Sequence, residues 1–343
     1  MRLKAKLFAS LLLVSSVLSA QDFKLTESGY FKNAGVDVMA YDDIYPEGHQ
    51  GGVCIIMNGN RVATNGDIRL EATPGQWQPV PKQLIRTVGE NSIDVTLCFP
   101  DSSRHMTGFN PMIYPDLNFN YQVRVEAVGN HIEVNVDLDK PIPETFIGKV
   151  GFNLEFFPGS LFGKPWIMDE KSGIYPQQPN SPLMTTTPNH LHPGDYHNGK
   201  SPLANMKHLI GEGYSPIVAD DIISEPYAIG KKFTSRPDDP YSKLTIESLS
   251  GDLQLYDGRM NHNNGWFVLR SNIQPNTTKG AVKWIITPNI ENDWMYKPVI
   301  QTSQVGYHPA QNKEAIIELL QGTDLLFIAS GMGGGTGTGA ASV

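Results

Sequence analysis

Cysteine is scarce in this chain. Two occur among its 343 residues, Cys54 and Cys98, and each lies in a short strand-like run. In an oxidising compartment the two can form a disulfide if their strands are neighbours, and otherwise they are buried free thiols. Neither cysteine has a histidine context that would support a catalytic thiol.

Basic residues are also fewer than acidic ones. The chain has 27 Lys and Arg against 35 Asp and Glu, which gives a formal net charge of −8 at pH 7. A protein that binds nucleic acid presents a basic face to the phosphate backbone. The acidic balance therefore predicts that nucleic acid is not a partner. Glycine and proline, at 33 and 25 residues, are plentiful instead, which is typical of a turn-rich β protein.

The apolar run at the N-terminus is too short to span a bilayer. It extends over residues 7–18, follows the cations Arg2, Lys4 and Lys6, and is followed by Ser19 and Ala20. This order of charge, apolar run and small residues is that of a secretory signal peptide. We therefore expect a signal peptide over residues 1–20, a secreted or periplasmic protein, and no membrane span after its removal.

Period-two alternation dominates the first half of the chain and predicts a mainly β fold. Apolar residues alternate with polar ones over 121–127 and 132–138, with Gly129-Asn130 between them as the turn of a hairpin. Two further turn signals, Asn58-Gly59-Asn60 and Asn65-Gly66-Asp67, separate short strands. Strands at this spacing indicate a β-sandwich or supersandwich. Further strands are expected at 36–41, 84–88, 150–157, 244–249, 253–256, 266–269 and 281–286.

The periodicity fades between residues 158 and 240, where prolines recur among Gly, Asn and aromatic residues. A segment of this kind is a functional loop, or a cover over a sheet. The later strands complete the same sandwich, so we expect one N-terminal β-sandwich domain over 21–297 that carries a long loop insertion at 158–240.

The segment 298–320 carries a family resemblance. Its core reads Ser303-Gln304-Val305-Gly306-Tyr307-His308-Pro309 and is followed by an Ala-Ile-Ile strand. This string resembles the start of the immunoglobulin-like domain that precedes the catalytic domain in glycoside hydrolase family 9 cellulases. The region 23–297 is similar in style to the extra N-terminal sandwich of secreted bacterial members. The resemblance implies a truncated immunoglobulin-like β segment over 298–320.

The resemblance also implies that catalysis lies elsewhere. In the family, paired aspartates in an Asp-x-Gly-Asp motif and a distant glutamate act on the polysaccharide, and inverting hydrolysis places such carboxylates about 6.5–9.5 Å apart. The nearest string here, His192-Pro193-Gly194-Asp195-Tyr196, has histidine in place of the first aspartate and lies upstream of the family motif. We therefore expect no catalytic residues and no cofactor in this chain, with a polysaccharide or oligosaccharide as partner.

The last residues, 321–343, carry a different resemblance. Gly333-Gly334-Gly335-Thr336-Gly337-Thr338-Gly339, with the apolar run before it, resembles the signature loop of the FtsZ/tubulin family. There the glycines let backbone N–H groups approach a nucleotide phosphate. The other parts of that nucleotide site are missing, and a signal peptide conflicts with a cytoplasmic polymer. The sequence thus favours a chimera of two fragments, with GTP binding of the FtsZ type as an alternative.

The densest polar cluster is His190, His192, Asp195 and His197. These residue types can chelate a metal ion, but no strand or helix is predicted to fix their geometry. The alternative is a solvated, hydrogen-bonded loop, which we favour.

Aromatic residues among Gly, Pro and Asn suit the faces and hydroxyls of sugar rings. The candidates are Trp166, Tyr175, Tyr196 and Tyr214. The alternative is that these rings pack the loop onto the sheet. The adjacent acidic pair Asp238-Asp239 is interpreted as turn and surface residues, because neighbours on a strand point to opposite faces.

The leading hypothesis is therefore the non-catalytic N-terminal part of a secreted family 9-like glycoside hydrolase, which contacts carbohydrate or supports a catalytic domain. A stand-alone glycan-binding or surface structural module is the alternative of a different class.

Overall fold

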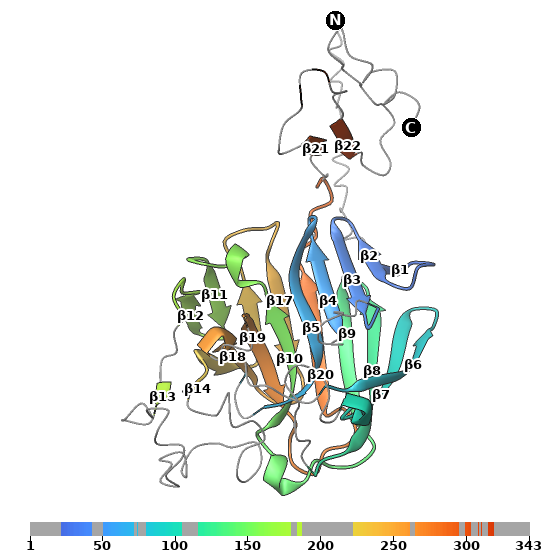
Figure 1. Ribbon diagram of the computed structural model, residues 1–343, viewed down its shortest axis with the longest axis vertical. Helices are drawn as coiled ribbons and strands as arrows, with labels where there is room; N and C mark the ends of the chain where they lie inside the picture. Colours follow the sequence, from blue (N-terminus) through green and yellow to red (C-terminus); the bar gives the residue numbers. More distant parts are fainter. Residues whose placement is uncertain are drawn as a thin grey trace, which may run out of the picture.

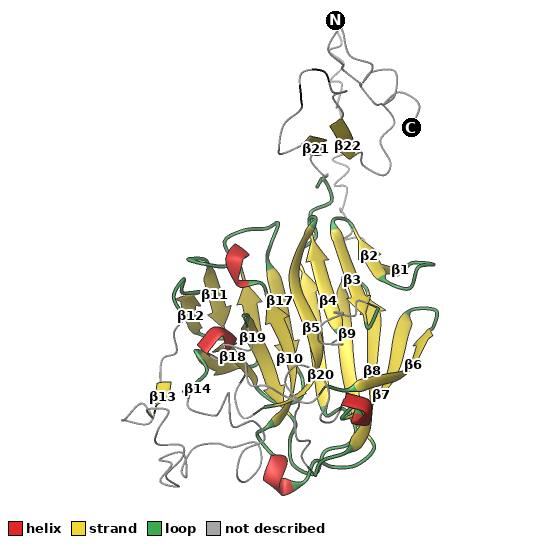
Figure 2. Cartoon of the chain, viewed as in Figure 1, coloured by secondary structure: helices red, strands yellow, loops and turns green. Residues whose placement is uncertain are grey.

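The chain folds into two antiparallel β-sheets packed face to face, as Figures 1 and 2 show. Among the residues that the structure describes, each sheet has nine strands, and the predicted mainly β, sandwich-like fold is confirmed. The computed structural model describes residues 22–42, 51–71, 74, 80–104, 116–179, 184–186, 222–260, 265–294, 299–302, 308, 310 and 315–318.

The first sheet combines strands from both halves of the chain. In spatial order it consists of β1 (Lys24–Leu25), β2 (Phe31–Asn33), β3 (Val36–Ala40), β4 (Val53–Met57), β5 (Asn60–Leu70), β10 (Val150–Phe156), β19 (Phe267–Asn272), β18 (Leu253–Asp257) and β15 (Ala228–Gly230). Strand β5 is therefore hydrogen-bonded to β10, about eighty residues further along the chain.

The second sheet faces the first. Its order is β12 (Lys171–Ile174), β11 (Pro165–Met168), β16 (Lys232–Ser235), β17 (Leu244–Ser248), β20 (Val282–Pro288), β9 (His131–Leu138), β8 (Phe119–Val128), β7 (Ser92–Phe99) and β6 (Lys82–Val88). Two-stranded sheets are formed by β13 (Met184–Thr186) with β14 (Ile222–Ser224) and by β21 (Val299–Thr302) with β22 (Ala315–Glu318).

Short 3₁₀ helices connect some of the strands. They are η1 (Ser102–Arg104), η2 (Glu144–Phe146), η3 (Pro158–Ser160) and η6 (Gly258–Met260). Crossing a bilayer demands a longer and more apolar helix than any found among the described residues.

The predicted hairpin around Gly129 is confirmed. Strands β8 and β9 pair from Tyr121 with Leu138 to Val128 with His131, so two residues form the turn. Gly129 has φ of 58°, the left-handed conformation that glycine adopts without a steric penalty. The alternating apolar side chains of both strands are buried, which places one face of the hairpin in the core.

The pair Asn65-Gly66 is not the turn that its sequence predicts. It lies inside the 11-residue strand β5, where the register against β10 is irregular. Asn65 has φ of 55°, and a Cβ on Gly66 would lie 2.7 Å from the Cβ of Val53. These are the features of a β-bulge, which uses the same left-handed residues as a tight turn. The strand therefore bends here and continues.

Residues 158–240 were predicted as a loop insertion, and their described parts, 158–179, 184–186 and 222–240, contain the six strands β11 to β16. Strands β11, β12 and β16 extend the second sheet, and β15 forms an edge of the first. Each is three or four residues long. Strands this short produce no readable alternation, and Pro165 occupies the first position of β11, where a missing N–H is tolerated. The pattern therefore predicts a loop where short strands form.

Trp284 lies at the centre of the core between the sheets. Its side chain is 1% exposed and meets the ring of Phe152 edge to face, with ring centroids 5.0 Å apart. Its indole N–H donates to Ser271 Oγ at 3.1 Å. The β20 tryptophan is thus packed against β10 and hydrogen-bonded to β19, which both belong to the opposite sheet.

Cys54 and Cys98 are not joined by a disulfide. Cys54 lies on β4 in the first sheet, and Cys98 lies on β7 in the second. Because the two strands are not neighbours in one sheet, the condition for the disulfide that the sequence left open is not met.

Buried tyrosines make the fold sensitive to high pH. Burial raises the pKa of Tyr256 from 10.0 to about 12. Burial also raises the pKa values of Tyr41 and Tyr121 well above 10.0, and the nearby Asp67 carboxylate adds to the effect. A pKa raised on folding contributes stability that is full below the unfolded value and is lost as pH rises toward the folded value.

We therefore expect the free energy of unfolding to fall as the pH rises above 10. Tyr256 alone should account for about 1.4 kcal/mol at pH 11, the amount that corresponds to one pKa unit. Urea unfolding at several pH values between 8 and 11 measures the loss. Between pH 8 and 11, the free energy of unfolding of Tyr256→Phe should fall by about 1.4 kcal/mol less than that of the unmodified chain. Equal pH dependence in the two proteins would contradict the raised pKa of Tyr256.

Candidate functional site

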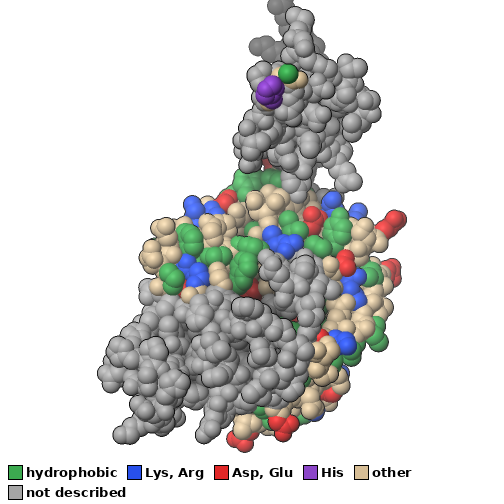
Figure 3. Space-filling view, viewed as in Figure 1, with side chains coloured by type: hydrophobic (Ala, Val, Ile, Leu, Met, Phe, Trp, Pro, Cys, Tyr) green, Lys and Arg blue, Asp and Glu red, His purple; other side chains and the backbone are tan. Residues whose placement is uncertain are grey.

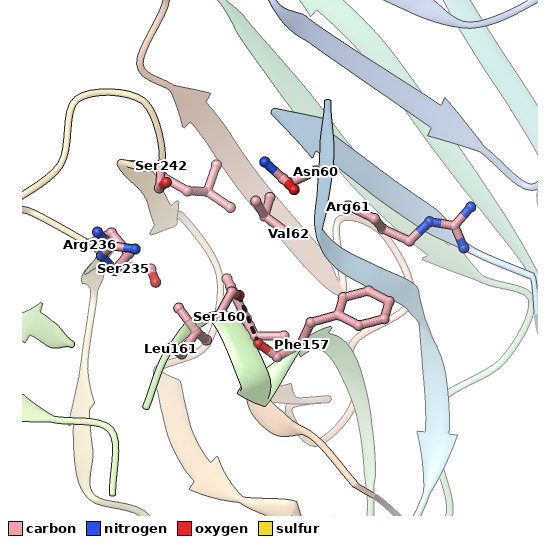
Figure 4. A pocket seen from close by; sticks show the side chains of 11 residues that line it. Asn60, Arg61, Val62, Phe157, Ser160, Leu161, Ser235, Arg236 and Ser242 are labelled. Carbon is pink, nitrogen blue, oxygen red and sulfur yellow. Dashed lines mark hydrogen bonds between the residues drawn. The ribbon is translucent and has the colours of Figure 1, made fainter. Parts of the chain in front are cut away.

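A pocket of about 280 Å³ opens between the two sheets at one end of the sandwich. Figure 4 shows it enclosed by β5 on one side, β16 and the loop that follows it on the other, and η3 below. The lining residues are Asn60, Arg61, Val62, Phe156, Phe157, Ser160, Leu161, Ser235, Arg236, Ser242 and Leu244. The side chains of Arg61 and Phe157 point away, beyond β5 (Figure 4), so the cavity is surrounded mainly by small polar and apolar groups.

The loop between β16 and β17 builds one wall and is fixed by side chains from other strands. Asn58 donates to the carbonyl oxygen of Tyr241 at 2.6 Å, and Asn289 donates to the carbonyl oxygen of Pro240 at 2.9 Å. Within the loop, Asp239 accepts from the backbone N–H of Tyr241 and from Ser242 Oγ. This wall is thus built to hold a defined shape.

Arg236 is the charged residue of this wall. Its backbone lies in the left-handed region with φ of 53°, a conformation that costs energy for a residue with a side chain. Its Nε donates to Asp238 at 3.1 Å and its Nη2 donates to Asp239 at 2.8 Å. The side chain is 12% exposed. The guanidinium is therefore held from both sides, and within the described chain its Nη1 makes no hydrogen bond.

Two more polar groups point toward the same space. Ser235 Oγ accepts a hydrogen bond from the hydroxyl of Tyr175 at 2.9 Å, so its own proton is available to a ligand. Asn60 uses its Nδ2 to donate to the carbonyl oxygen of Asn58, and its side-chain oxygen remains as an acceptor. Donors and acceptors thus surround an apolar floor, where Phe156 packs against Phe233.

A second concentration of polar groups is buried in the first sheet around Arg270. Its side chain is 2% exposed. Nη1 donates to Asn153 at 2.8 Å and to Glu71 Oε1 at 3.3 Å. Nη2 donates to the carbonyl oxygens of Lys149 at 2.7 Å and Glu71 at 3.2 Å, and Nε donates to Asn272 at 2.8 Å. Burial lowers the pKa of Arg270. Each guanidinium nitrogen is thus satisfied, as a structural role requires.

Asp67 forms a related buried group beside the bulge. Its Oδ1 accepts from the hydroxyls of Tyr41 and Tyr121, both at 2.8 Å, and from the backbone N–H of Ile68 at 2.7 Å. Arg69 lies 3.7 Å from its other oxygen. Burial raises the pKa of Asp67, and Arg69 opposes this shift. Because Tyr41 follows β3 and Tyr121 belongs to β8, one carboxylate links both sheets.

Two of the predicted sugar-binding aromatics are core residues. Trp166 on β11 is 4% exposed and Tyr175 is fully buried. Tyr175 packs against Phe267 with ring centroids 4.7 Å apart, and Trp166 lies against Tyr227. Their rings face the core of the sandwich, which favours the packing role that the sequence left as the alternative. Tyr175 still reaches the pocket indirectly, through its hydrogen bond to Ser235.

The other predicted site residues lie outside the described residues. They are the aromatics Tyr196 and Tyr214, the metal candidates His190, His192, Asp195 and His197, and the loop residues Gly333, Gly334, Gly335, Thr336, Gly337, Thr338 and Gly339. Within the described residues no group of three or more His, Cys, Asp or Glu side chains could hold a metal ion. On the face drawn in Figure 3, charged and apolar side chains are interspersed over the sandwich.

The pocket residues were not identified from the sequence. The adjacent pair Asp238-Asp239 was interpreted as a turn, and the hydrogen bonds of Asp239 confirm that role. The signal that could have drawn attention to the pocket is the string Ser235-Arg236-Pro237-Asp238-Asp239-Pro240, where two prolines frame two acids directly after an arginine. In a rigid turn that combines opposite charges, the carboxylates can fix a guanidinium by charge-assisted hydrogen bonds.

Comparison with known proteins gives short matches. Over 41 residues the chain is 61% identical to the cell division protein FtsZ of Azotobacter vinelandii. The matched segment covers 12% of this chain and 10% of that protein. It is 56% identical over 41 residues to the cell division protein FtsZ of Pseudomonas putida, with the same coverage. The chain thus spans about a tenth of the length of these curated relatives. No family model matches the chain, and no solved structure matches it.

Proposed function

We propose that this chain is a carbohydrate-contacting, non-catalytic module of a secreted polysaccharide-degrading enzyme similar to glycoside hydrolase family 9. The observation that carries the proposal is the pocket at the end of the sandwich. Its polar groups, from Asn60, Ser235 and Arg236, surround an apolar floor. Sugars present hydroxyls around an apolar ring, so a mixed lining of this kind suits them.

The size of the pocket supports a small unit of a glycan. Small-molecule pockets are typically about 300–1,000 Å³, and this one is about 280 Å³. A terminal sugar ring of an oligosaccharide fits such a space, whereas a long chain would have to continue outside it. The lining offers hydrogen bonds and apolar contacts through which a sugar could bind. The family resemblance at Ser303–Pro309 supports a polysaccharide as the source of that sugar.

Blocking the pocket should abolish binding. Ser160 lies exposed at the rim on η3, and its hydroxyl donates to the Phe157 carbonyl oxygen at 3.1 Å. We expect Ser160→Trp to weaken the affinity for a soluble neutral β-glucan oligosaccharide at least about tenfold, or about 1.4 kcal/mol, because the indole occupies the ligand space. Isothermal titration calorimetry on the full chain measures the change.

The matched control is Ser172→Trp, which places the same side chain on the exposed edge strand β12. It should leave the affinity unchanged. Equal loss in both variants, or no binding by the unmodified chain, would contradict a glycan site in the pocket. Release of reducing ends from the same β-glucan would contradict the non-catalytic part of the proposal.

A further inference from the structure

Two aromatic rings lie directly outside the pocket, on the face of the first sheet that points away from the core. Phe156 and Phe267 are partners in the register of β10 and β19, and both are buried, with 1% and 0% of their surface exposed. Because successive side chains of a strand point to opposite faces, the flanking residues Phe157 and Trp266 face the other way. Their rings meet edge to face, with centroids 4.4 Å apart and an interplanar angle of 83°.

This aromatic pair and the pocket lie on two sides of the same strand ends. Phe157 is one of the lining residues of the pocket, and its ring points away from the cavity, whereas Val62 points into it (Figure 4). The backbone N–H of Phe157 donates to the carbonyl oxygen of Val62 at 3.4 Å, so the two residues are neighbours where β5 meets β10. A ligand that extends out of the pocket around these strand ends therefore reaches the aromatic pair.

The aromatic pair is partly exposed and held in place. Both Phe157 and Trp266 retain exposed surface. Gly159 and Gly265, which stand next to the pair in the chain, are exposed, and a Cβ added to either glycine would meet nothing within 4 Å beyond its chain neighbours. The carbonyl oxygen of Phe157 accepts from Ser160 Oγ at 3.1 Å, which fixes the backbone under the ring. The rings thus present a fixed apolar surface with open space beside it.

We propose that Phe157 and Trp266 form a second sugar subsite, which binds a ring further along the glycan whose terminal ring occupies the pocket. The inference rests on the proposed glycan site and extends it. Pyranose rings have apolar faces, and the flat surface of an indole packs well against a face of this kind. The ligand class is therefore an oligosaccharide or polysaccharide chain, in preference to a monosaccharide.

The separation of the two subsites sets the length of that ligand. The pocket opens between the sheets, whereas the aromatic pair lies on the opposite face of the first sheet, so the path between them crosses the thickness of one sheet layer, on the order of 10 Å. A monosaccharide that fills the pocket of about 280 Å³ does not reach the aromatic pair. A hexasaccharide is long enough to occupy both subsites, and the added contact area increases its affinity.

The test compares methyl β-glucoside with a β-linked glucose hexasaccharide, each titrated calorimetrically into the full chain. We expect the unmodified chain to bind the hexasaccharide at least about tenfold more tightly. In Trp266→Ala the affinity for the hexasaccharide should fall at least about tenfold, and that for the glucoside should change by less than about twofold, because only the longer ligand reaches the indole. Trp266→Phe keeps an aromatic ring and should retain part of the advantage of the hexasaccharide. Leu249→Ala is the control, because this 59% exposed side chain follows β17 at the end away from the pocket.

Urea unfolding of each variant shows whether it is folded. If Trp266→Ala does not fold, Trp266→Leu takes its place, since leucine keeps an apolar side chain against Phe157 but has no flat ring. An equal loss of affinity for both ligands would show that Trp266 only supports the fold, and would overturn the inference, as would an unchanged affinity for the hexasaccharide. In either case, loss of binding in Ser160→Trp would leave the pocket as the glycan site. Binding of neither ligand by the unmodified chain would instead refute the proposed function, and this inference with it.

Discussion

Arg270→Met should lower the free energy of unfolding by about 3–5 kcal/mol, the cost of breaking a buried ion pair from one side. The substitution removes the guanidinium that lies 3.3 Å from Glu71 Oε1, a carboxylate whose side chain is 1% exposed. It also removes a hydrogen-bond donor to the carbonyl oxygens of Lys149 and Glu71. Methionine fills part of the space but donates nothing. Urea unfolding followed by circular dichroism measures the loss.

Arg124→Met is the matched control for this experiment. Arg124 also pairs with two carboxylates, Asp94 and Glu126, but its side chain is 44% exposed. Exposed pairs contribute about 0–1 kcal/mol, so little should change. The double variant Arg270→Met with Glu71→Met should recover part of the stability, because the buried carboxylate is then removed together with the guanidinium. Equal effects at Arg270 and Arg124 would show that the buried network contributes no more than a surface pair.

Trp284→Ala should be about as damaging, at about 3–5 kcal/mol. The indole is 1% exposed at the centre of the core, so its removal leaves a cavity that the two sheets cannot close. It also deprives Phe152 of its edge-to-face partner and Ser271 of a hydrogen-bond donor. The same urea experiment measures the effect.

Two variants separate the contributions of Trp284. Trp284→Phe keeps an aromatic ring against Phe152 and should cost clearly less than Trp284→Ala, since the cavity is smaller. Ile174→Ala removes apolar surface from a side chain that is 64% exposed and should change stability by no more than about 0.5 kcal/mol. If Trp284→Ala is tolerated as well as Ile174→Ala, the core assignment of the tryptophan is wrong.

Local patterns in the sequence were sufficient for the longer strands, but not for the short strands within 158–240 or for how the strands are arranged. The alternation over 121–138 predicts β8, β9 and their turn, because a hairpin is specified by adjacent residues. The pair Asn65-Gly66 was misjudged for the opposite reason. An Asn-Gly pair suits a turn and a bulge equally, and the neighbour that decides between them, β10, lies about eighty residues away.

The pocket could not be predicted from sequence patterns for the same physical reason. Its walls come from β5, β10, β16 and β17, which lie next to one another only after both sheets have formed. The aromatic residues that stood out, Trp166 and Tyr175, were chosen by composition, and composition does not distinguish a ring that packs in a core from a ring that faces a ligand. The residues that line the pocket are mostly serines and aliphatic residues, which carry no signature of their own.

The carboxylate of Asp67, which holds Tyr41 from one sheet and Tyr121 from the other, makes the two sheets cooperative. If one sheet separates from the other, the Asp67 carboxylate loses one of its two tyrosine donors while it remains buried. The free energy lost in this way opposes a partial opening of the sandwich. The halves of the sandwich should therefore exchange their backbone amide hydrogens with solvent together, as one opening unit. A single side chain thus couples the unfolding of the two sheets.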